Sequence, residues 1–157
     1  MTRLSPNFIL AELIRSRTAL QRGLDNTPDD SALAALRRLT ENILQPVRER
    51  FGLPFSPSSA YRSAAVNRAV GGSPHSQHLR GEAADFSIPG VGALTVAQFI
   101  RDHLSFDQLI LATGPGGDPQ RGWLHCSYRN EKENRRQLLT FRDGRYLPGL
   151  PGETVAV

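Results

Sequence analysis

The chain has 157 residues, of which 39% are hydrophobic and 22% charged. That length and composition favour one soluble globular domain, with no low-complexity tract and no internal repeat. A single cysteine, Cys126, excludes an intramolecular disulfide and a zinc knuckle built from cysteines. The net charge of +4 suits polyanionic partners, but the arginines are scattered, so we interpret them as a solvated surface and expect no nucleic-acid site.

The sequence predicts neither a secretory leader nor a membrane span. Glu12 interrupts the apolar stretch near the N-terminus, and no run approaches about 18 apolar residues. We therefore expect a monomer that is made in the cytoplasm without a signal peptide and has no stable membrane association.

Helices are predicted in the first third of the chain. Ser5-Pro6-Asn7, followed by apolar residues as far as Ile14, predicts a short capped amphipathic helix. Asp29 opens the clearest helix, whose apolar residues recur at helical spacing as far as Phe51. Pro46 is expected to kink or divide that helix.

The rest of the chain predicts short strands with two further helices. The predicted strands are 55–61, 83–88, 106–111 and 122–127, followed by a hairpin of 138–141 and 145–147 around Asp143-Gly144. The predicted helices are 64–70 and 95–104, the second capped by Thr95. Helices followed by a small, mostly antiparallel sheet give an α+β fold. We expect one domain over 1–150 and a flexible tail over 151–157, frayed from Pro148 onward.

Three of the four histidines, His75, His78 and His125, flank predicted strands. His103 lies late in a predicted helix, where its charge suits the negative end of the helix dipole. Asp85 interrupts an apolar strand, and a buried carboxylate there needs several donors or a cation. His78, Asp85 and His125 have the composition of an open catalytic zinc site, although spacing alone favours ordinary hydrogen-bonded histidines.

Strand alternation separates the side chains around the last histidine. Trp123, His125 and Ser127 fall on one face of their predicted strand, and Cys126 falls on the other. His75 precedes a turn. We therefore predict that neither Cys126 nor His75 contacts a metal ion.

The pattern SxHxxGxAxD at 76–85 and the pattern WxHxS at 123–127 together resemble the peptidase M15 superfamily. The resemblance is to its phage and bacterial D-alanyl-D-alanine carboxypeptidases and L-alanyl-D-glutamate endopeptidases. Further matching segments are 4–8, 58–63, 67–72 and 106–110, so that it covers nearly the whole chain. It implies a Hedgehog/D,D-peptidase-like fold with N-terminal helices on a small sheet, one zinc ion, and peptidoglycan stem peptides as the partner.

The resemblance also implies roles for single residues. The positions that match the zinc ligands are His78, Asp85 and His125. Arg62 matches an arginine that contacts the peptide and polarises its scissile carbonyl, a task that suits the forked donors of a guanidinium. Ser76 matches a serine near the metal that donates to substrate or to a ligand. Trp123 belongs either to the core or to the wall of the substrate cleft.

The carboxylate expected to serve as general base is missing. In this branch a glutamate is expected at position 112, where the chain has Ala112, and in other branches the base stands three residues before the last zinc histidine, at Gly122. Three explanations remain open: an inactive relative that keeps zinc for structure, a deliberate base-to-alanine variant, or another group serving from a loop. The candidates for that group are Asp118, Glu82 and His75. The family-like strand around Ala112 favours the variant.

Two functions of different classes follow. The first is a zinc metallopeptidase, similar to a bacteriophage endolysin, that reaches the cell wall after release and hydrolyses stem peptides unless Ala112 has inactivated it. Either the D-alanyl-D-alanine or the L-alanyl-D-glutamate bond fits. The alternative is a non-catalytic, zinc-stabilised module that binds the cell wall or has a structural role.

Overall fold

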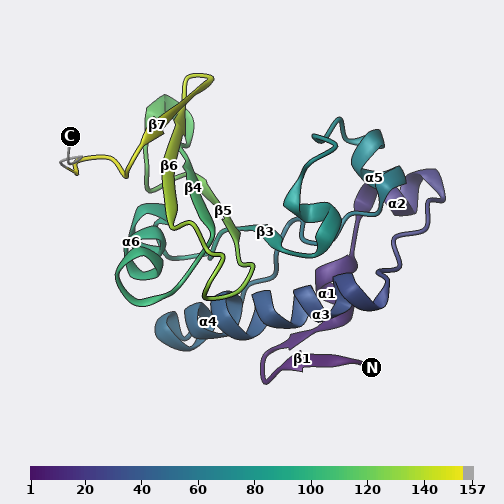
Figure 1. The fold of residues 1–157 in the computed structure, drawn as a ribbon. Coiled ribbons are helices and arrows are strands. Elements are labelled where there is room, and N and C mark those ends of the chain that lie inside the picture. Colours follow the sequence, from purple (N-terminus) through teal and green to yellow (C-terminus); the bar gives the residue numbers. More distant parts are fainter. Residues whose placement is uncertain (154–157) are drawn as a thin grey trace.

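The N-terminal residues form a hairpin before they form a helix. In the computed structural model, which describes residues 1–153, β1 (Arg3–Ser5) pairs antiparallel with β2 (Phe8–Ile9), and α1 (Leu10–Ile14) follows (Figure 1). The helix expected from Ser5 is therefore wrong in its first part. The reason is a distant contact: the side-chain oxygen of Gln45 accepts hydrogen bonds from the Ser5 hydroxyl at 2.7 Å and the Asn7 amide at 3.0 Å, which holds the turn in place.

One long helical segment runs across the lower part of the molecule in Figure 1, above the β1–β2 hairpin. It consists of α3 (Asp30–Leu39), a π-helical turn (Thr40–Leu44) and α4 (Gln45–Phe51). The Asp29 carboxylate caps its start by accepting a hydrogen bond from the Ala32 amide at 2.8 Å. The boundary expected at Pro46 is confirmed. Proline has no N–H to donate back into the helix, and the wider π turn ends at Leu44, two residues before it.

A second group of helices forms a separate side of the molecule. It contains α2 (Arg17–Arg22) and α5 (Ala64–Ala69), which are in contact, and the 3₁₀ turn η2 (Gln77–Arg80). The helix predicted at 64–70 is confirmed as α5. The strand predicted at 55–61 is wrong, because in this segment only Ser59 forms a bridge, to Asp85. Pro57 cannot donate a ladder hydrogen bond there.

A five-stranded sheet forms the other side, in the order β3-β5-β4-β6-β7. Its strands are β3 (Ala83–Phe86), β4 (Gln108–Ala112), β5 (Trp123–Ser127), β6 (Gln137–Arg142) and β7 (Arg145–Pro148). β4 and β6 are parallel, and the other neighbours are antiparallel. The α+β class is confirmed. The hairpin around Asp143-Gly144 is confirmed too, with φ of 51° and 74° as its two-residue turn requires.

Strand alternation divides this sheet into a core face and an open face. Leu109, Leu111 and Leu124 are at most 1% exposed and belong to the core that the helices cover. α6 (Ala93–His103) packs on β4 and β5 from that side. It begins earlier than predicted: its cap is Gly92, not Thr95, whose amide donates to the Gln120 side chain at 3.2 Å.

The chain remains packed beyond Pro148, where fraying was expected. Leu150 is 4% exposed and belongs to the core, and Glu153 forms an ion pair with Arg101. Residues 154–157 of the expected tail lie outside the described residues. Within the described part of the chain, no helix has the length and apolar character needed to cross a membrane.

The turn at Gly81 yields a prediction about stability. Gly81 has φ +72°, and an added Cβ would lie 2.5 Å from the Ala32 carbonyl oxygen on α3. Gly52, at the end of α4, has φ +68° but open space around it. We expect Gly52→Ala to cost about 1–2 kcal/mol of unfolding free energy from backbone strain alone. Gly81→Ala should cost about 1–3 kcal/mol more, because it also overpacks the interface with α3. Urea unfolding of the two variants measures the difference, and equal losses would show that this interface yields easily.

Candidate metal centre

Three side chains that are distant in the sequence converge between the two sides of the molecule. His78 comes from η2, Asp85 from β3 and His125 from β5, where Asp85 and His125 are direct register partners. One nitrogen or oxygen from each of the three lies within 4.8 Å of the others. In the described part of the chain, neither His75 nor Cys126 joins this group. Cys126 is fully buried on the core face of β5.

A hydrogen bond to the backbone orients His78. Its Nδ1 lies 2.6 Å from the Ala60 carbonyl oxygen, and the ring is almost fully buried. Because a carbonyl can only accept, Nδ1 must carry the hydrogen. In the neutral ring the lone pair is then on Nε2, which faces Asp85 at 3.3 Å. This is the usual way in which a backbone carbonyl prepares a histidine to bind a metal.

The Asp85 carboxylate lies at the centre of the cluster. Its Oδ1 is 2.8 Å from His125 Nδ1, and its Oδ2 is 3.7 Å from the Arg62 guanidinium. Burial by itself would raise the pKa of Asp85, but hydrogen bonds and charge from His125 and His78 outweigh it and hold that pKa well below its ordinary value. The group therefore stays ionised at neutral pH and is available to a cation.

The arrangement fits a zinc ion. Tetrahedral zinc with bonds of about 2.0–2.1 Å places its ligand atoms about 3.3 Å apart. The separations from Asp85 Oδ1 are 3.3 Å to His78 Nε2 and 2.8 Å to His125 Nδ1, both close to that spacing. Two histidines and one carboxylate also leave a coordination position open, which is typical of catalytic zinc rather than structural zinc.

Arg62 is fixed beside this cluster. Its Nε donates to the Ser59 hydroxyl at 3.1 Å and its Nη1 to the Asn67 side-chain oxygen at 3.2 Å. Burial lowers the pKa of Arg62, and the charge of Asp85 opposes that change. The guanidinium remains protonated at any physiological pH. It therefore places a fixed positive charge next to the metal centre.

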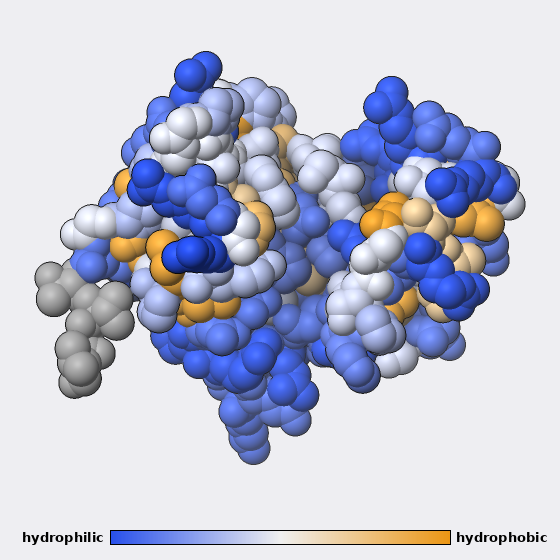
Figure 2. All heavy atoms as spheres, turned by 90° about the horizontal axis from the view of Figure 1, so that it is seen from above, coloured by the Kyte–Doolittle hydropathy of each residue, from blue (hydrophilic) through white to orange (hydrophobic). Residues whose placement is uncertain are grey.

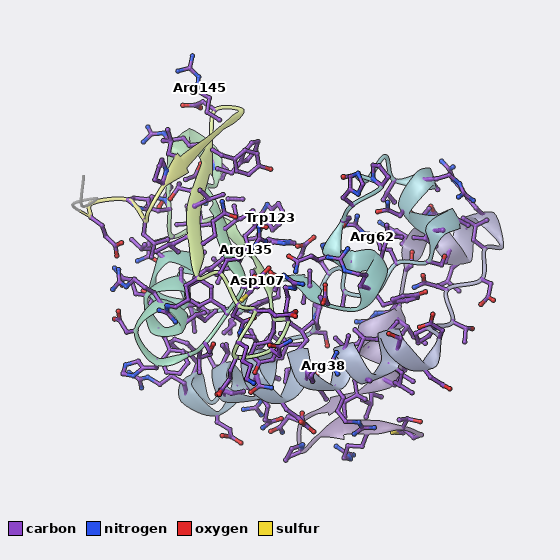
Figure 3. The ribbon with its side chains drawn as sticks, in the orientation of Figure 1. Arg38, Arg62, Asp107, Trp123, Arg135 and Arg145 are labelled. Atoms are coloured by element: carbon purple, nitrogen blue, oxygen red, sulfur yellow. The ribbon has the colours of Figure 1, made fainter. Side chains whose placement is uncertain are left out.

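The cluster lines a cleft of about 820 Å³ between the sheet and the η2–α5 side. Figure 2 shows the hollow from above, and Figure 3 shows Trp123 on the sheet side with Arg62 on the opposite side. Trp123 is 47% exposed and lines the cleft, so it is not a core residue. Ser76 also lines the cleft, and its hydroxyl oxygen accepts from the His78 amide at 3.2 Å.

The two positions expected to hold the general base differ in what they can accommodate. Ala112 ends β4 opposite Trp123 and lines the cleft, on the same face as Ile110, the register partner of His125. At Gly122 an added Cβ would overlap the Ala112 carbonyl oxygen. No side chain fits at Gly122 unless β4 and β5 move apart, so of the two positions only 112 can hold an acid in this backbone.

The other candidates for the base are placed differently. The Asp118 carboxylate accepts from the Gln120 amide at 2.9 Å, and Glu82 accepts from Arg80 at 2.8 Å. Neither Asp118 nor Glu82 lines the cleft, whereas His75 does. Of the three, only His75 is near enough to the cleft to meet a bound peptide.

A second buried carboxylate, which the sequence had not singled out, lines the cleft. Asp107 is 0% exposed and accepts from the Arg135 amide at 2.9 Å, from Arg135 Nε at 3.0 Å and from Arg135 Nη2 at 2.8 Å. Gln77 donates to it at 3.0 Å, and the Ser127 hydroxyl lies 3.5 Å away. Asp107 lies between Phe106 and Gln108 in the strand predicted at 106–111, and a carboxylate buried in such a strand needs donors or a cation, which is the signal that could have found it.

The chain was compared with known proteins. The model of the family described as Peptidase M15 matches residues 6–127, which include the three clustered residues, Arg62 and Ala112. A zinc D-Ala-D-Ala carboxypeptidase from Streptomyces albus G is 32% identical over 111 residues. That alignment covers 70% of this chain and 41% of the relative, so the chain spans less than half of the relative's length.

The cluster predicts how zinc should affect stability. A ligand that binds only the native state at 100 times its Kd adds about 2.7 kcal/mol to the unfolding free energy. We therefore expect zinc to raise the Tm of the unaltered chain and of the control His75→Ala, but not of His125→Ala. Elemental analysis should give about one zinc per chain in the first two proteins. A His125→Ala protein that still binds zinc and gains the same Tm shift would contradict the assignment.

Asp107 predicts a dependence of stability on pH. Burial would raise its pKa, but the hydrogen bonds and charge of Arg135, together with the Gln77 hydrogen bond, hold it below its ordinary value. A lowered pKa in the folded state stabilises the fold above the pKa of an unfolded aspartate, about 3.9, and that stabilisation is lost as the pH falls further.

At pH 7, Asp107→Asn should therefore lower the unfolding free energy by about 1.5–3 kcal/mol, the usual contribution of a hydrogen-bonded charge. The difference in unfolding free energy between this variant and the unaltered chain should shrink below about pH 4. Unfolding curves at several pH values, recorded with a chelator present, measure it. The exposed Asp143→Asn is the control and should show little change. A loss of unfolding free energy that is the same at every pH would mean that packing and neutral hydrogen bonds, and not the charge of Asp107, stabilise this site.

Proposed function

Because the chain belongs to the peptidase M15 family, we propose that it is a zinc-dependent peptidase domain whose cleft takes stem peptides of bacterial peptidoglycan. The convergence of His78, Asp85 and His125 beside Arg62, at an open cleft, carries the proposal. The named activity of the Streptomyces relative supports the same class of substrate. The resemblance to endolysins extends the proposal to a domain that acts on the wall from outside the cytoplasm.

The residues of the cleft suggest how a peptide is held. A zinc ion, when bound to His78, Asp85 and His125, supplies Lewis acidity that polarises a carbonyl and makes water a better nucleophile. Arg62 offers forked donors to the scissile carbonyl or to a nearby carboxylate. The Ser76 oxygen accepts from the His78 amide, so its own hydrogen remains free to donate to the peptide. Trp123 supplies an apolar wall.

The cleft lacks a free carboxylate to move protons. Within the described residues only Asp85 and Asp107 are acidic among those lining it. Asp85 belongs to the metal cluster, and Asp107 is fully buried beneath several donors. The methyl group of Ala112 can neither accept nor donate a proton. We therefore propose that the chain holds its peptide but hydrolyses it slowly.

The same observation favours a second candidate function. A cleft that binds metal and peptide without a general base suits a non-catalytic module that recognises the cell wall. The two functions differ in the effect that an acidic side chain at position 112 would have on hydrolysis. In the first, an acid placed there completes the site, and in the second the cleft has also lost other features that hydrolysis requires.

Substitution at position 112 separates the two functions. General acid–base groups contribute about 10²–10⁴-fold to rate, so Ala112→Glu should raise hydrolysis of a peptidoglycan stem peptide by about that factor. Ala112→Gln is the matched control, with the same size and no titratable group, and should not. Both variants should bind zinc as the unaltered chain does. Cleavage is followed by mass spectrometry, which also identifies the bond that breaks.

The other outcomes are equally informative. If the unaltered chain already matches Ala112→Glu, another group acts as base, and His75→Ala should then abolish the activity. If Ala112→Glu remains inactive with zinc bound, while the peptide binds, the non-catalytic module is the better account.

A further inference from the structure

Arg135 is held on the sheet side of the cleft, in the loop between β5 and β6, by a carboxylate that is itself inaccessible to solvent. The Asp107 carboxylate accepts hydrogen bonds from Nε and Nη2 of Arg135, at 3.0 and 2.8 Å, and from the backbone amide of Arg135. Within residues 1–153, Nη1 of Arg135 has no hydrogen-bond partner. The Arg135 side chain is 53% exposed and lines the cleft. One edge of the guanidinium is therefore anchored, and the other is available to a ligand.

This arrangement differs from an ordinary surface ion pair. A solvated arginine samples many rotamers, and fixing it costs side-chain entropy that weakens the pair. Here the entropy cost is met within the fold, because a fully buried acid with further donors from Gln77 and Ser127 fixes the guanidinium before any ligand arrives. The cleft arginines Arg80 and Arg129 pair instead with Glu82 and Glu133, whose side chains are 14% and 54% exposed, whereas the Asp107 side chain is 0% exposed.

The charge around Arg135 favours an anionic ligand. Four arginines line the cleft, Arg62, Arg80, Arg129 and Arg135, against two carboxylates that are both already paired. Arg62 and Arg135 lie on opposite sides of the cleft (Figure 3). The metal cluster approaches Arg62 through Asp85. A peptide that extends from the metal towards the sheet side would bring a second group to the free edge of Arg135.

We propose that Arg135, positioned by Asp107, binds a carboxylate of the substrate away from the scissile bond and so makes the cleft selective for acidic peptides. This rests on the proposed function, and it adds a determinant outside the stretch matched by the family, which ends at residue 127. In a stem peptide that is cleaved at its D-alanyl-D-alanine bond, a carboxylate of this kind is the α-carboxylate of the γ-linked D-glutamate. Planar, forked donors suit a carboxylate better than they suit a neutral amide.

The test compares two peptides and several variants by calorimetric binding to the zinc-loaded chain. One peptide is L-Ala-γ-D-Glu-L-Lys-D-Ala-D-Ala with a free glutamyl α-carboxylate, and the other has a carboxamide there. We expect Arg135→Gln to weaken binding of the acid peptide by about tenfold or more, the usual scale for a charge-assisted hydrogen bond. Binding of the carboxamide peptide should change by less than about twofold, within the scatter of independent effects.

Two further variants control for charge and for folding. Arg145→Gln removes the same charge from the exposed hairpin tip, away from the cleft, and should leave the affinities of both peptides unchanged (Figure 3). Because Arg135→Gln leaves Asp107 buried with fewer donors, the double variant Asp107→Asn/Arg135→Gln removes that buried charge. It should lose the preference for the acid peptide just as the single variant does. Mass spectrometry confirms that the peptides stay intact.

Each remaining outcome decides a different claim. Equal losses for the two peptides, or a loss matched by Arg145→Gln, would overturn the role of Arg135 while leaving the proposed function standing. If the unaltered chain binds neither peptide, the proposed function fails and the role of Arg135 fails with it.

Discussion

The site depends on one register, the antiparallel pairing of β3 with β5 that sets Asp85 directly opposite His125. Because side chains alternate along a strand, a slip of one residue would turn Asp85 or His125 into the core and bring Ala84 or Cys126 to the cleft. The turn at Gly81 and the hydrogen bond from His78 to the Ala60 carbonyl then place the third side chain against this pair. The metal centre therefore depends on the sheet and is not a property of any one segment.

Two carboxylates are removed from water near the cleft, and the fold compensates them in different ways. Asp85 is stabilised by groups that can also hold a cation, so a metal can replace part of what the histidines provide. Asp107 is stabilised by an arginine, a glutamine and a hydroxyl, and a metal would have no accessible oxygen there. Burial raises the pKa of both groups, and hydrogen-bond donors more than reverse the effect. Asp85 thus belongs to the candidate metal site, and Asp107 fixes the position of Arg135.

The two acids together are the reason why the proposed function gives weight to Ala112. With Asp85 and Asp107 both engaged, the cleft within the described residues is cationic and has no carboxylate free to take a proton. On the proposed function, such a cleft keeps groups that would hold a peptide, namely the candidate metal centre, fixed arginines and the Trp123 wall, and lacks a group that would move protons. The steric block at Gly122 makes position 112 the remaining place for an acid between β4 and β5.

The sequence by itself determined the parts that local interactions control. Periodicity predicted the helix that opens after Asp29, Asp143-Gly144 predicted the late hairpin, and a family pattern singled out His78, Asp85 and His125. Only the tertiary structure decided the N-terminal hairpin, because its turn is held by hydrogen bonds to Gln45. Only the tertiary structure showed that residues 55–61 form no strand, since Ser59 alone in that segment forms a bridge, to Asp85. It also decided the contact of Asp107 with Arg135, 28 residues away. These features rest on pairs of residues that folding brings together, and the pattern of neighbours in a sequence carries no signal for such distant partners.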